Sequence, residues 1–125
     1  RPMDTKQSGH HVSFIHAWDG ILWAVRTQPN FRVHLFLSAV ALFLCWFFSV
    51  STIEYLVIAF TILLGLSAEM INTAIEAMTD LITHEYSKDA KIAKDVAAGM
   101  MLTIAIGAII IGCVIFGPRI FARIF

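Results

Sequence analysis

Apolar residues form three long runs in the second part of this chain, and short polar segments separate them. The runs cover residues 33–50, 53–81 and 91–117. Each is long enough for a helix to cross the ~30 Å of hydrocarbon in a bilayer. Ser51 and Thr52 separate the first two runs, and the polar loop 83–91 separates the last two. The pattern therefore predicts three membrane-spanning helices with short connections.

The segment before these runs, residues 13–28, is amphipathic. Its apolar side chains recur at helical spacing along one face, at Phe14, Trp18, Ile21, Leu22 and Val25. We expect a surface helix that lies along the membrane and ends at Pro29, with a helix packed into a core as the alternative. Residues 1–12 are polar, and we expect them to form a flexible tail without a cleavable signal peptide.

Composition strengthens the membrane interpretation. Of the 125 residues, 58% are hydrophobic and only 14% are charged, whereas a soluble domain carries about 25% charge. The sequence thus predicts one all-α membrane domain covering residues 1–125.

The net charge is zero and no basic patch mixed with aromatic residues appears, so we expect no nucleic-acid partner. Cys45 and Cys113 lie in apolar runs without metal-ligand spacing, which predicts buried small apolar residues.

The distribution of lysine and arginine predicts an orientation. The N-terminal side and the segment 83–94 together carry Arg1, Lys6, Arg26, Arg32, Lys88, Lys91 and Lys94. The opposite side carries only Arg119 and Arg123. Because positive residues are retained on the cytoplasmic side, we expect the N-terminus and the 83–94 segment in the cytoplasm and the C-terminus outside.

Polar residues interrupt the second apolar run on one face. Within an arc of roughly 80°, a helix would carry Glu69, Asn72, Glu76 and Asp80. We call these four residues the acidic stripe. Carboxylates are costly in or near a bilayer, so such residues are functional candidates by default. The hairpin into the third run should bring Lys94 and Asp95 opposite the stripe.

The residue types in this region suit phosphate chemistry. Carboxylate and amide oxygens are ligands for Mg²⁺, and a lysine suits a phosphate. Glu69 lies deepest in the predicted span, where it could accept a proton from a lipid hydroxyl. The same residues would also suit ion passage or proton transport, although a pore needs polar residues through its whole depth and the second run is apolar before Ser67. No Walker A motif or kinase glycine loop is present.

Several of these residues also have a structural interpretation. Glu76 and Asp80 could form ion pairs with Lys91 or Lys94, and Asn72 could join two helices. His34, at the mouth of the first run, is more typical of an interface residue than of a ligand. In the third run, small residues spaced four apart predict close helix packing, at Gly99, Thr103 and Gly107 and at Ala108 and Gly112.

Three stretches, EMINTAIEAMTDLI, AKDVAAG and HAWDGILWAVRTQPNFRVH, resemble the small prokaryotic diacylglycerol kinase and undecaprenol kinase family. The similarity runs from about Phe14 to Pro118. It implies a homotrimer in the bacterial cytoplasmic membrane, with active sites at the cytoplasmic interface built from neighbouring subunits. It also implies transfer of the γ-phosphate of ATP to a lipid alcohol, with Mg²⁺.

The resemblance also implies residue roles. Glu69 matches the catalytic base, while Asn72 and Asp80 match further active-site polar positions. The nucleotide-binding positions are His16, Gln28, Glu76, Glu85, Tyr86, Ser87, Lys94 and Asp95, and the metal-binding positions among them are Glu76 and Gln28. The lipid-contacting positions are Phe31, Arg32, His34, Glu69 and Ala98.

Two features distinguish this chain within the family. A glutamate often stands where it has Gln28, and the amide supplies an oxygen but no charge. The segments Arg26–Thr27, Asn30–His34 and Ala97–Gly99 resemble the undecaprenol kinase branch more than the diacylglycerol kinase branch. We therefore expect undecaprenol as the acceptor, with diacylglycerol as the alternative.

Overall fold

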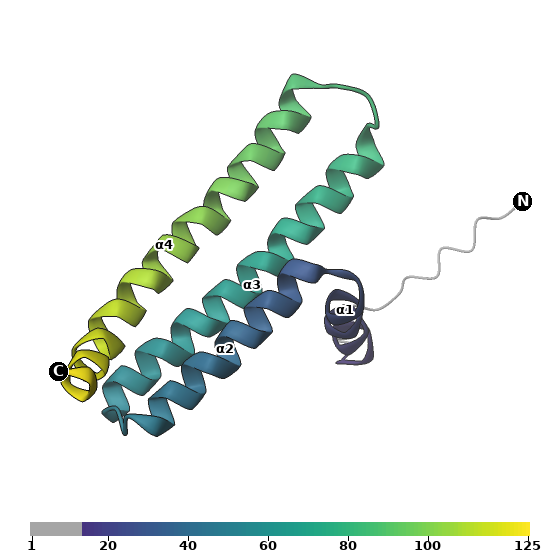
Figure 1. The fold of residues 1–125 in the computed structure, drawn as a ribbon. Coiled ribbons are helices and arrows are strands. Elements are labelled where there is room, and N and C mark those ends of the chain that lie inside the picture. Colours follow the sequence, from purple (N-terminus) through teal and green to yellow (C-terminus); the bar gives the residue numbers. More distant parts are fainter. Residues whose placement is uncertain (1–13) are drawn as a thin grey trace, which may run out of the picture.

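The computed structural model describes residues 14–125, and this part of the chain is almost entirely helical (Figure 1). In chain order the helices are α1 (Phe14–Thr27), α2 (Pro29–Phe47), α3 (Thr52–Ile82) and α4 (Lys88–Ile124). The last three are long and apolar enough to cross a membrane. The predicted all-α membrane fold is confirmed, while the tail expected at residues 1–12 lies outside the described residues.

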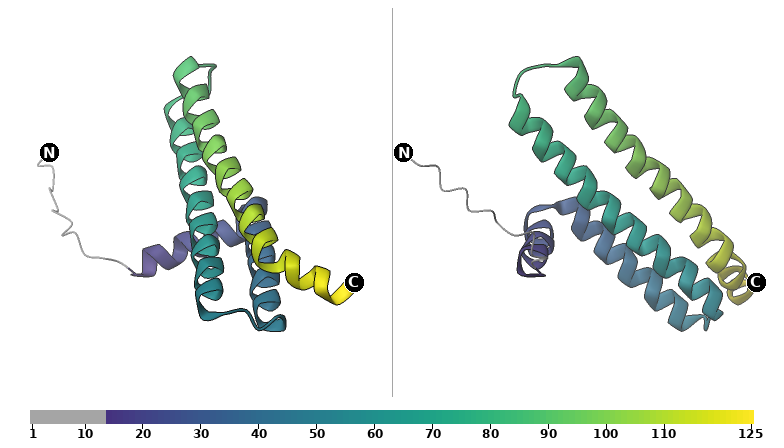
Figure 2. Two further views of the ribbon diagram at one scale, coloured as in Figure 1. Left: turned by 90° about the vertical axis from the view of Figure 1, so that its left-hand side faces the viewer. Right: turned by 180° about the vertical axis from the view of Figure 1, so that it is seen from behind.

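Helix α3 is the centre of the arrangement, because it packs against both α2 and α4. The three long helices run alongside one another, and α1 crosses them at a steep angle (Figures 1 and 2). This is the geometry expected of three spans and one helix lying along the membrane surface. The first half of the apolar face of α1 is not packed into the bundle, since Phe14 is 82% exposed and Trp18 is 59% exposed, whereas Leu22 and Val25 in its second half are half-buried.

Helix α2 begins at Pro29, earlier than the predicted residue 33. The first turn of a helix has no intrahelical partner for its N–H groups, so a proline is well tolerated there. Gln28 has an extended backbone and forms the break between α1 and α2. Pro29 is therefore the first residue of α2, and it also follows the end of the surface helix α1.

The start of α3 is fixed by a capping box. The Ser51 hydroxyl accepts a hydrogen bond from the Glu54 N–H, and the Glu54 carboxylate accepts one from the Ser51 N–H. Ser49, in the preceding turn, has a left-handed backbone with φ of 49°. These local contacts let the chain reverse direction within a few residues.

Helix α4 is longer than the predicted 91–117 at both ends. The Ser87 hydroxyl caps its first turn by accepting from the Ala90 N–H, so the loop expected at 83–91 is shorter. The helix also continues past Pro118. A proline removes one backbone hydrogen bond and bends a helix without necessarily ending it, and the last turns of α4 turn aside in Figure 2.

The final turns of α4 are attached to the turn between α2 and α3. Arg119 donates two hydrogen bonds to the Glu54 carboxylate, at 2.7 and 2.8 Å. The Arg123 guanidinium lies over the Phe47 ring, 4.5 Å from its centroid. A small core of Cys45, Ile58, Ile115 and Phe116 lies at this end of the bundle.

Much of the apolar surface remains uncovered by the chain itself. Only 11%, 28% and 11% of the apolar windows of α2, α3 and α4 are buried. Cys45 is buried as expected, but Cys113 is exposed, which corrects the burial predicted for it. A side chain added at Gly99, Gly107 or Gly112 would meet nothing within 4 Å, so these small residues do not pack on a helix within residues 14–125. Lipid or further protein chains are the surroundings that such faces require.

Candidate functional site

The acidic stripe lies on the second half of α3 and passes from a buried to an exposed environment. Glu69 is 4% exposed and Asn72 is 9% exposed. Glu76 and Asp80, one and two turns further along, are exposed. The residue expected to lie deepest is therefore the most buried of the four.

The level of the stripe relative to the other helices explains this gradient. The ends of α3 and α4 that meet at the 83–87 turn extend beyond the start of α2 (Figure 1). Helix α1 lies against the side of α3 here, where Gly20, Trp23 and Ala24 face Met70, Thr73, Ala74 and Ala77 around a small cavity. If α1 marks the membrane surface, the stripe begins below that surface and ends above it.

Asn72 joins the buried and exposed parts of the stripe. Its Nδ2 donates to Glu76 Oε1 at 3.4 Å. Its Oδ1 is buried without a hydrogen-bond partner in the part of the chain that the structure describes. A buried carbonyl oxygen left unpaired beside a carboxylate costs free energy, and a cation or a donor from a ligand would satisfy it.

The hairpin between α3 and α4 brings Lys94 to the stripe. Lys94 Nζ donates to Asp80 Oδ1 at 2.6 Å, and both side chains are about half exposed. Asp95 does not join them in these contacts, because its carboxylate pairs with Lys91 on the same helix. In the part of the chain that the structure describes, Lys94 thus contacts the stripe directly, while Asp95 contacts Lys91.

Glu69 has a neighbour that the sequence pattern did not pair with it. His34 Nε2 lies 3.9 Å from Glu69 Oε2. A Cβ atom added at Gly65 would lie 3.6 Å from His34 Nδ1, so the absence of a side chain at Gly65 allows the imidazole to lie close to α3. No signal in the sequence could have paired His34 with Glu69, because their contact depends on how α2 and α3 align.

The remaining candidate residues occupy separate places. Gln28 Nε2 donates to Thr27 Oγ1 at 3.3 Å, at the junction of α1 and α2. His16 is exposed on α1, Arg32 on α2 and Ala98 on α4, whereas Phe31 is only 4% exposed. In the 83–87 turn, Glu85 N–H donates to the Thr83 hydroxyl, Tyr86 is 84% exposed and Ser87 caps α4.

Residues 14–125 of one chain contain no group of three or more histidine, cysteine or acidic side chains placed to hold a metal ion. Asn72 Oδ1 and the Glu76 carboxylate are nevertheless adjacent oxygen donors. Mg²⁺ is commonly held by one or two carboxylates together with substrate phosphates and water. The donors present therefore fit a magnesium ion that arrives with a nucleotide better than a closed metal site.

One crosswise helix, three helices long enough to span a membrane and an acidic stripe at one end describe a small helical membrane protein with a candidate site at that end. Comparison with known proteins identifies the family to which the chain belongs. The family model of prokaryotic diacylglycerol kinases matches residues 15–116. The chain therefore belongs to the prokaryotic diacylglycerol kinase family, which confirms the resemblance inferred from the motifs.

Individual relatives carry two kinds of name. An undecaprenol kinase of Bacillus subtilis is 42% identical over 124 residues, covering 94% of this chain and 100% of that protein. A diacylglycerol kinase of Synechocystis is 40% identical over 109 residues, covering 86% of this chain. This chain spans only 62% of the Synechocystis protein. A diacylglycerol kinase of Escherichia coli K12 is 27% identical over 100 residues. Membership in this family makes the chain a membrane kinase, and a kinase requires a nucleotide co-substrate.

Proposed function

We propose that this protein transfers the γ-phosphate of ATP to the hydroxyl group of a membrane lipid alcohol, and that undecaprenol is its acceptor. The observation that carries the proposal is the gradient along the acidic stripe. Glu69 is buried among the spanning helices, while Glu76 and Asp80 on the same face are exposed. One continuous site can therefore meet a lipid at its buried end and a nucleotide at its exposed end.

At the buried end, Glu69 is the general base. The oxygen of the lipid hydroxyl attacks the γ-phosphorus and forms the new P–O bond, while the bond from that phosphorus to the β–γ bridging oxygen breaks. ADP leaves with the electrons of the broken bond, and the hydroxyl proton passes to the Glu69 carboxylate. A positioned base of this kind contributes roughly 10²–10⁴ to the rate.

At the exposed end, Lys94 and Glu76 bind the phosphates. Lys94 is already held over the stripe by Asp80, so an incoming phosphate competes with that carboxylate for the ammonium group. Asn72 Oδ1 and Glu76 would hold Mg²⁺, which when bound neutralises charge on the phosphate oxygens.

The other nucleotide contacts belong to the same proposal. Gln28 would add an uncharged amide oxygen near the metal, and Asp95 a further carboxylate. The positions at His16, Glu85, Tyr86 and Ser87 would complete the nucleotide site. Because α1 and the 83–87 turn are attached to different ends of the stripe, we propose that neighbouring subunits of a homotrimer bring these residues together. The uncovered apolar faces of α2 and α4 support such an assembly.

The proposed location is the bacterial cytoplasmic membrane, with the N-terminus and the site on the cytoplasmic side and the C-terminus outside. The excess of lysine and arginine at the site's end of the helices supports this orientation. ATP and Mg²⁺ would then reach the exposed end of the stripe directly.

Undecaprenol is favoured over diacylglycerol by two observations. The segments Arg26–Thr27, Asn30–His34 and Ala97–Gly99 resemble the undecaprenol kinase branch, and the Bacillus subtilis relative named undecaprenol kinase aligns over its whole length. Diacylglycerol remains the second candidate because the Synechocystis and Escherichia coli relatives are named for it. Phe31, Arg32, His34 and Ala98 are the proposed lipid contacts beside Glu69.

The test is phosphorylation by the purified protein in mixed micelles with labelled ATP and Mg²⁺. Undecaprenol and diacylglycerol are supplied at equal mole fraction, and the two kcat/KM values are compared. We expect label in undecaprenyl phosphate and a higher kcat/KM for undecaprenol. A higher value for diacylglycerol would select the second candidate, and no transfer to either lipid would refute the kinase proposal.

A further inference from the structure

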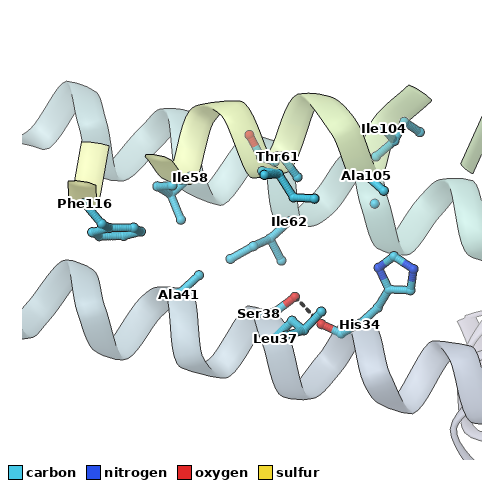
Figure 3. Close-up of a pocket in the computed structure, with 14 residues that line it drawn as sticks. His34, Leu37, Ser38, Ala41, Ile58, Thr61, Ile62, Ile104, Ala105 and Phe116 are labelled. Atoms are coloured by element: carbon cyan, nitrogen blue, oxygen red, sulfur yellow. Dashed lines mark hydrogen bonds between the residues drawn. The ribbon is translucent and has the colours of Figure 1, made fainter. Parts of the chain in front are cut away.

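The end of the bundle farthest from the acidic stripe carries charges that the proposed chemistry does not use. A cavity of about 320 Å³ between α2 and α4 lies between the two ends, with His34 toward the stripe and Phe116 at its far end (Figure 3). The 19 residues of α2 rise about 28 Å, close to the thickness of one hydrocarbon core. The α2–α3 turn and the last turns of α4 therefore lie at the headgroup layer of the leaflet opposite the stripe. We call this region the distal end.

One acid and one arginine at the distal end neutralise each other. Arg119 donates to both oxygens of the Glu54 carboxylate, at 2.7 and 2.8 Å. Glu54 Oε1 accepts a further hydrogen bond from the Ser51 N–H at 3.2 Å. Both carboxylate oxygens are thus occupied, so Glu54 has little capacity left for a cation from outside the chain.

Arg123 is a second cation at the distal end, and its charge is not neutralised within residues 14–125. Its guanidinium forms no ion pair and no hydrogen bond in that part of the chain, and the side chain is exposed. It lies 4.5 Å from the centroid of the Phe47 ring and 5.4 Å from that of Phe48. A guanidinium that stacks on an aromatic face keeps its N–H donors free at its edges. Arg123 therefore presents a positioned and unused set of donors.

The surroundings of Arg123 are typical of the layer in which lipid headgroups lie. Trp46 is 73% exposed at the same end, and tryptophan is enriched at membrane interfaces. The anion present in this layer is the phosphate diester of a phospholipid, and arginine binds phosphate oxygens through two parallel hydrogen bonds. A choline or ammonium group on the same lipid would need an acid, but Glu54 is already paired with Arg119. The charges therefore favour an anionic headgroup over a zwitterionic one.

We propose that Arg123, which lies over Phe47 and Phe48, binds the phosphate diester of an anionic phospholipid in the leaflet opposite the acidic stripe. The bound lipid is not the acceptor of phosphoryl transfer, so the inference is independent of the proposed kinase function. Arg123 belongs to α4 and the two rings to the end of α2, so a bound headgroup would hold the last turns of α4 against the α2–α3 turn. A ligand that binds only the closed arrangement slows local opening by mass action.

The test measures amide hydrogen exchange in residues 119–124 of the full chain in mixed micelles. Anionic phosphatidylglycerol and zwitterionic phosphatidylcholine with identical acyl chains are titrated separately into a neutral detergent. The mole fraction of phosphatidylglycerol that halves the exchange rate should be about fivefold below that of phosphatidylcholine, the factor that one basic residue near an anionic lipid surface typically contributes.

Three variants identify the group responsible. Arg123→Met keeps an unbranched side chain over the rings but removes the charge and the donors, so it should abolish the difference between the two lipids. Arg123→Lys keeps the charge without the planar fork and should retain a difference of about twofold. Arg26→Met is the matched control, because Arg26 is also exposed near the end of a helix but lies on α1, near the stripe. It should leave the preference at residues 119–124 unchanged.

The outcomes that would overturn the proposal are distinct. Equal effects of the two lipids on the wild-type chain would do so, as would a preference that survives in Arg123→Met. A loss as complete in Arg123→Lys as in Arg123→Met would show that packing, and not charge, sets the preference. A preference lost in Arg26→Met as well would show that the net charge of the chain attracts the lipid, which refutes a site at Arg123. Kinase activity enters none of these measurements, so their failure leaves the proposed function intact.

Discussion

Replacing Asn72 with leucine should make the protein more stable and less active. Asn72 is buried on α3, and its Oδ1 has no hydrogen-bond partner among the described residues. Leucine has a similar shape without the polar atoms. The substitution therefore removes an unpaired buried oxygen while keeping the packing of the helix.

The magnitude follows from the contacts of Asn72. An unsatisfied buried carbonyl costs about 1–3 kcal/mol. The bond that leucine loses, from Nδ2 to Glu76 Oε1, is long at 3.4 Å, and such a bond contributes at most about 0.5–1 kcal/mol. Asn72→Leu should thus raise the free energy of unfolding by about 1 kcal/mol, near the middle of the ~0–2.5 kcal/mol that these two terms allow. For a chain of this size that is an increase in Tm of about 3–5 °C.

The assay is thermal unfolding in detergent micelles, with lipid kinase activity measured on the same samples. Thr79→Val is the control, because Thr79 is also buried on α3 but its hydroxyl donates to the Ile75 oxygen at 2.7 Å. That variant removes a satisfied group and should not gain stability. If Asn72→Leu lowers Tm, then Oδ1 has a partner in the assembled protein and the reasoning is wrong.

Three further outcomes test the roles assigned above. Glu69→Gln should lower kcat by about 10²–10⁴ with the oligomer unchanged on size-exclusion chromatography, and a variant with more than a tenth of wild-type activity would contradict the role of base. Lys94→Gln should raise KM for ATP more than KM for the lipid, whereas the reverse pattern would remove Lys94 from the phosphate site. Arg119→Met should speed amide hydrogen exchange in residues 119–124, since the ion pair with Glu54 holds this end of α4, and unchanged exchange would show that the ion pair does not hold it.

The long helices could be predicted from the sequence because hydrophobic periodicity reports burial in lipid or protein directly. The ends of these helices were harder to predict from the sequence. The predicted third span stopped at residue 117 before Pro118, but α4 continues to Ile124 because a proline costs one hydrogen bond and the helix regains contacts through Arg119 and Arg123. The partners of these two arginines, Glu54 and Phe47, lie on other helices. The sequence pattern around Pro118 does not contain these partners.

The acidic stripe was predictable for the same reason, since residues on one helix have fixed relative directions. Lys94 and Asp95 point about 100° apart on α4, and Lys94 pairs with Asp80 on α3 whereas Asp95 pairs with Lys91 on its own helix. The contacts of His34 with Glu69 and of Glu54 with Arg119 join different helices. Their register depends on turns and packing that no single segment encodes.

The different lengths of α2 and α3 connect the site to the thickness of the host membrane. The 19 residues of α2 span about 28 Å, close to one hydrocarbon core, whereas the 31 residues of α3 span about 46 Å. A thicker bilayer would cover more of the projecting end of α3 and draw Asn72 and Glu76 toward the lipid tails. A thinner bilayer would bring Glu69 nearer to water. Hydrophobic mismatch would therefore tune how far ATP can approach the acceptor, so acyl-chain length in the surrounding lipid becomes a control on turnover.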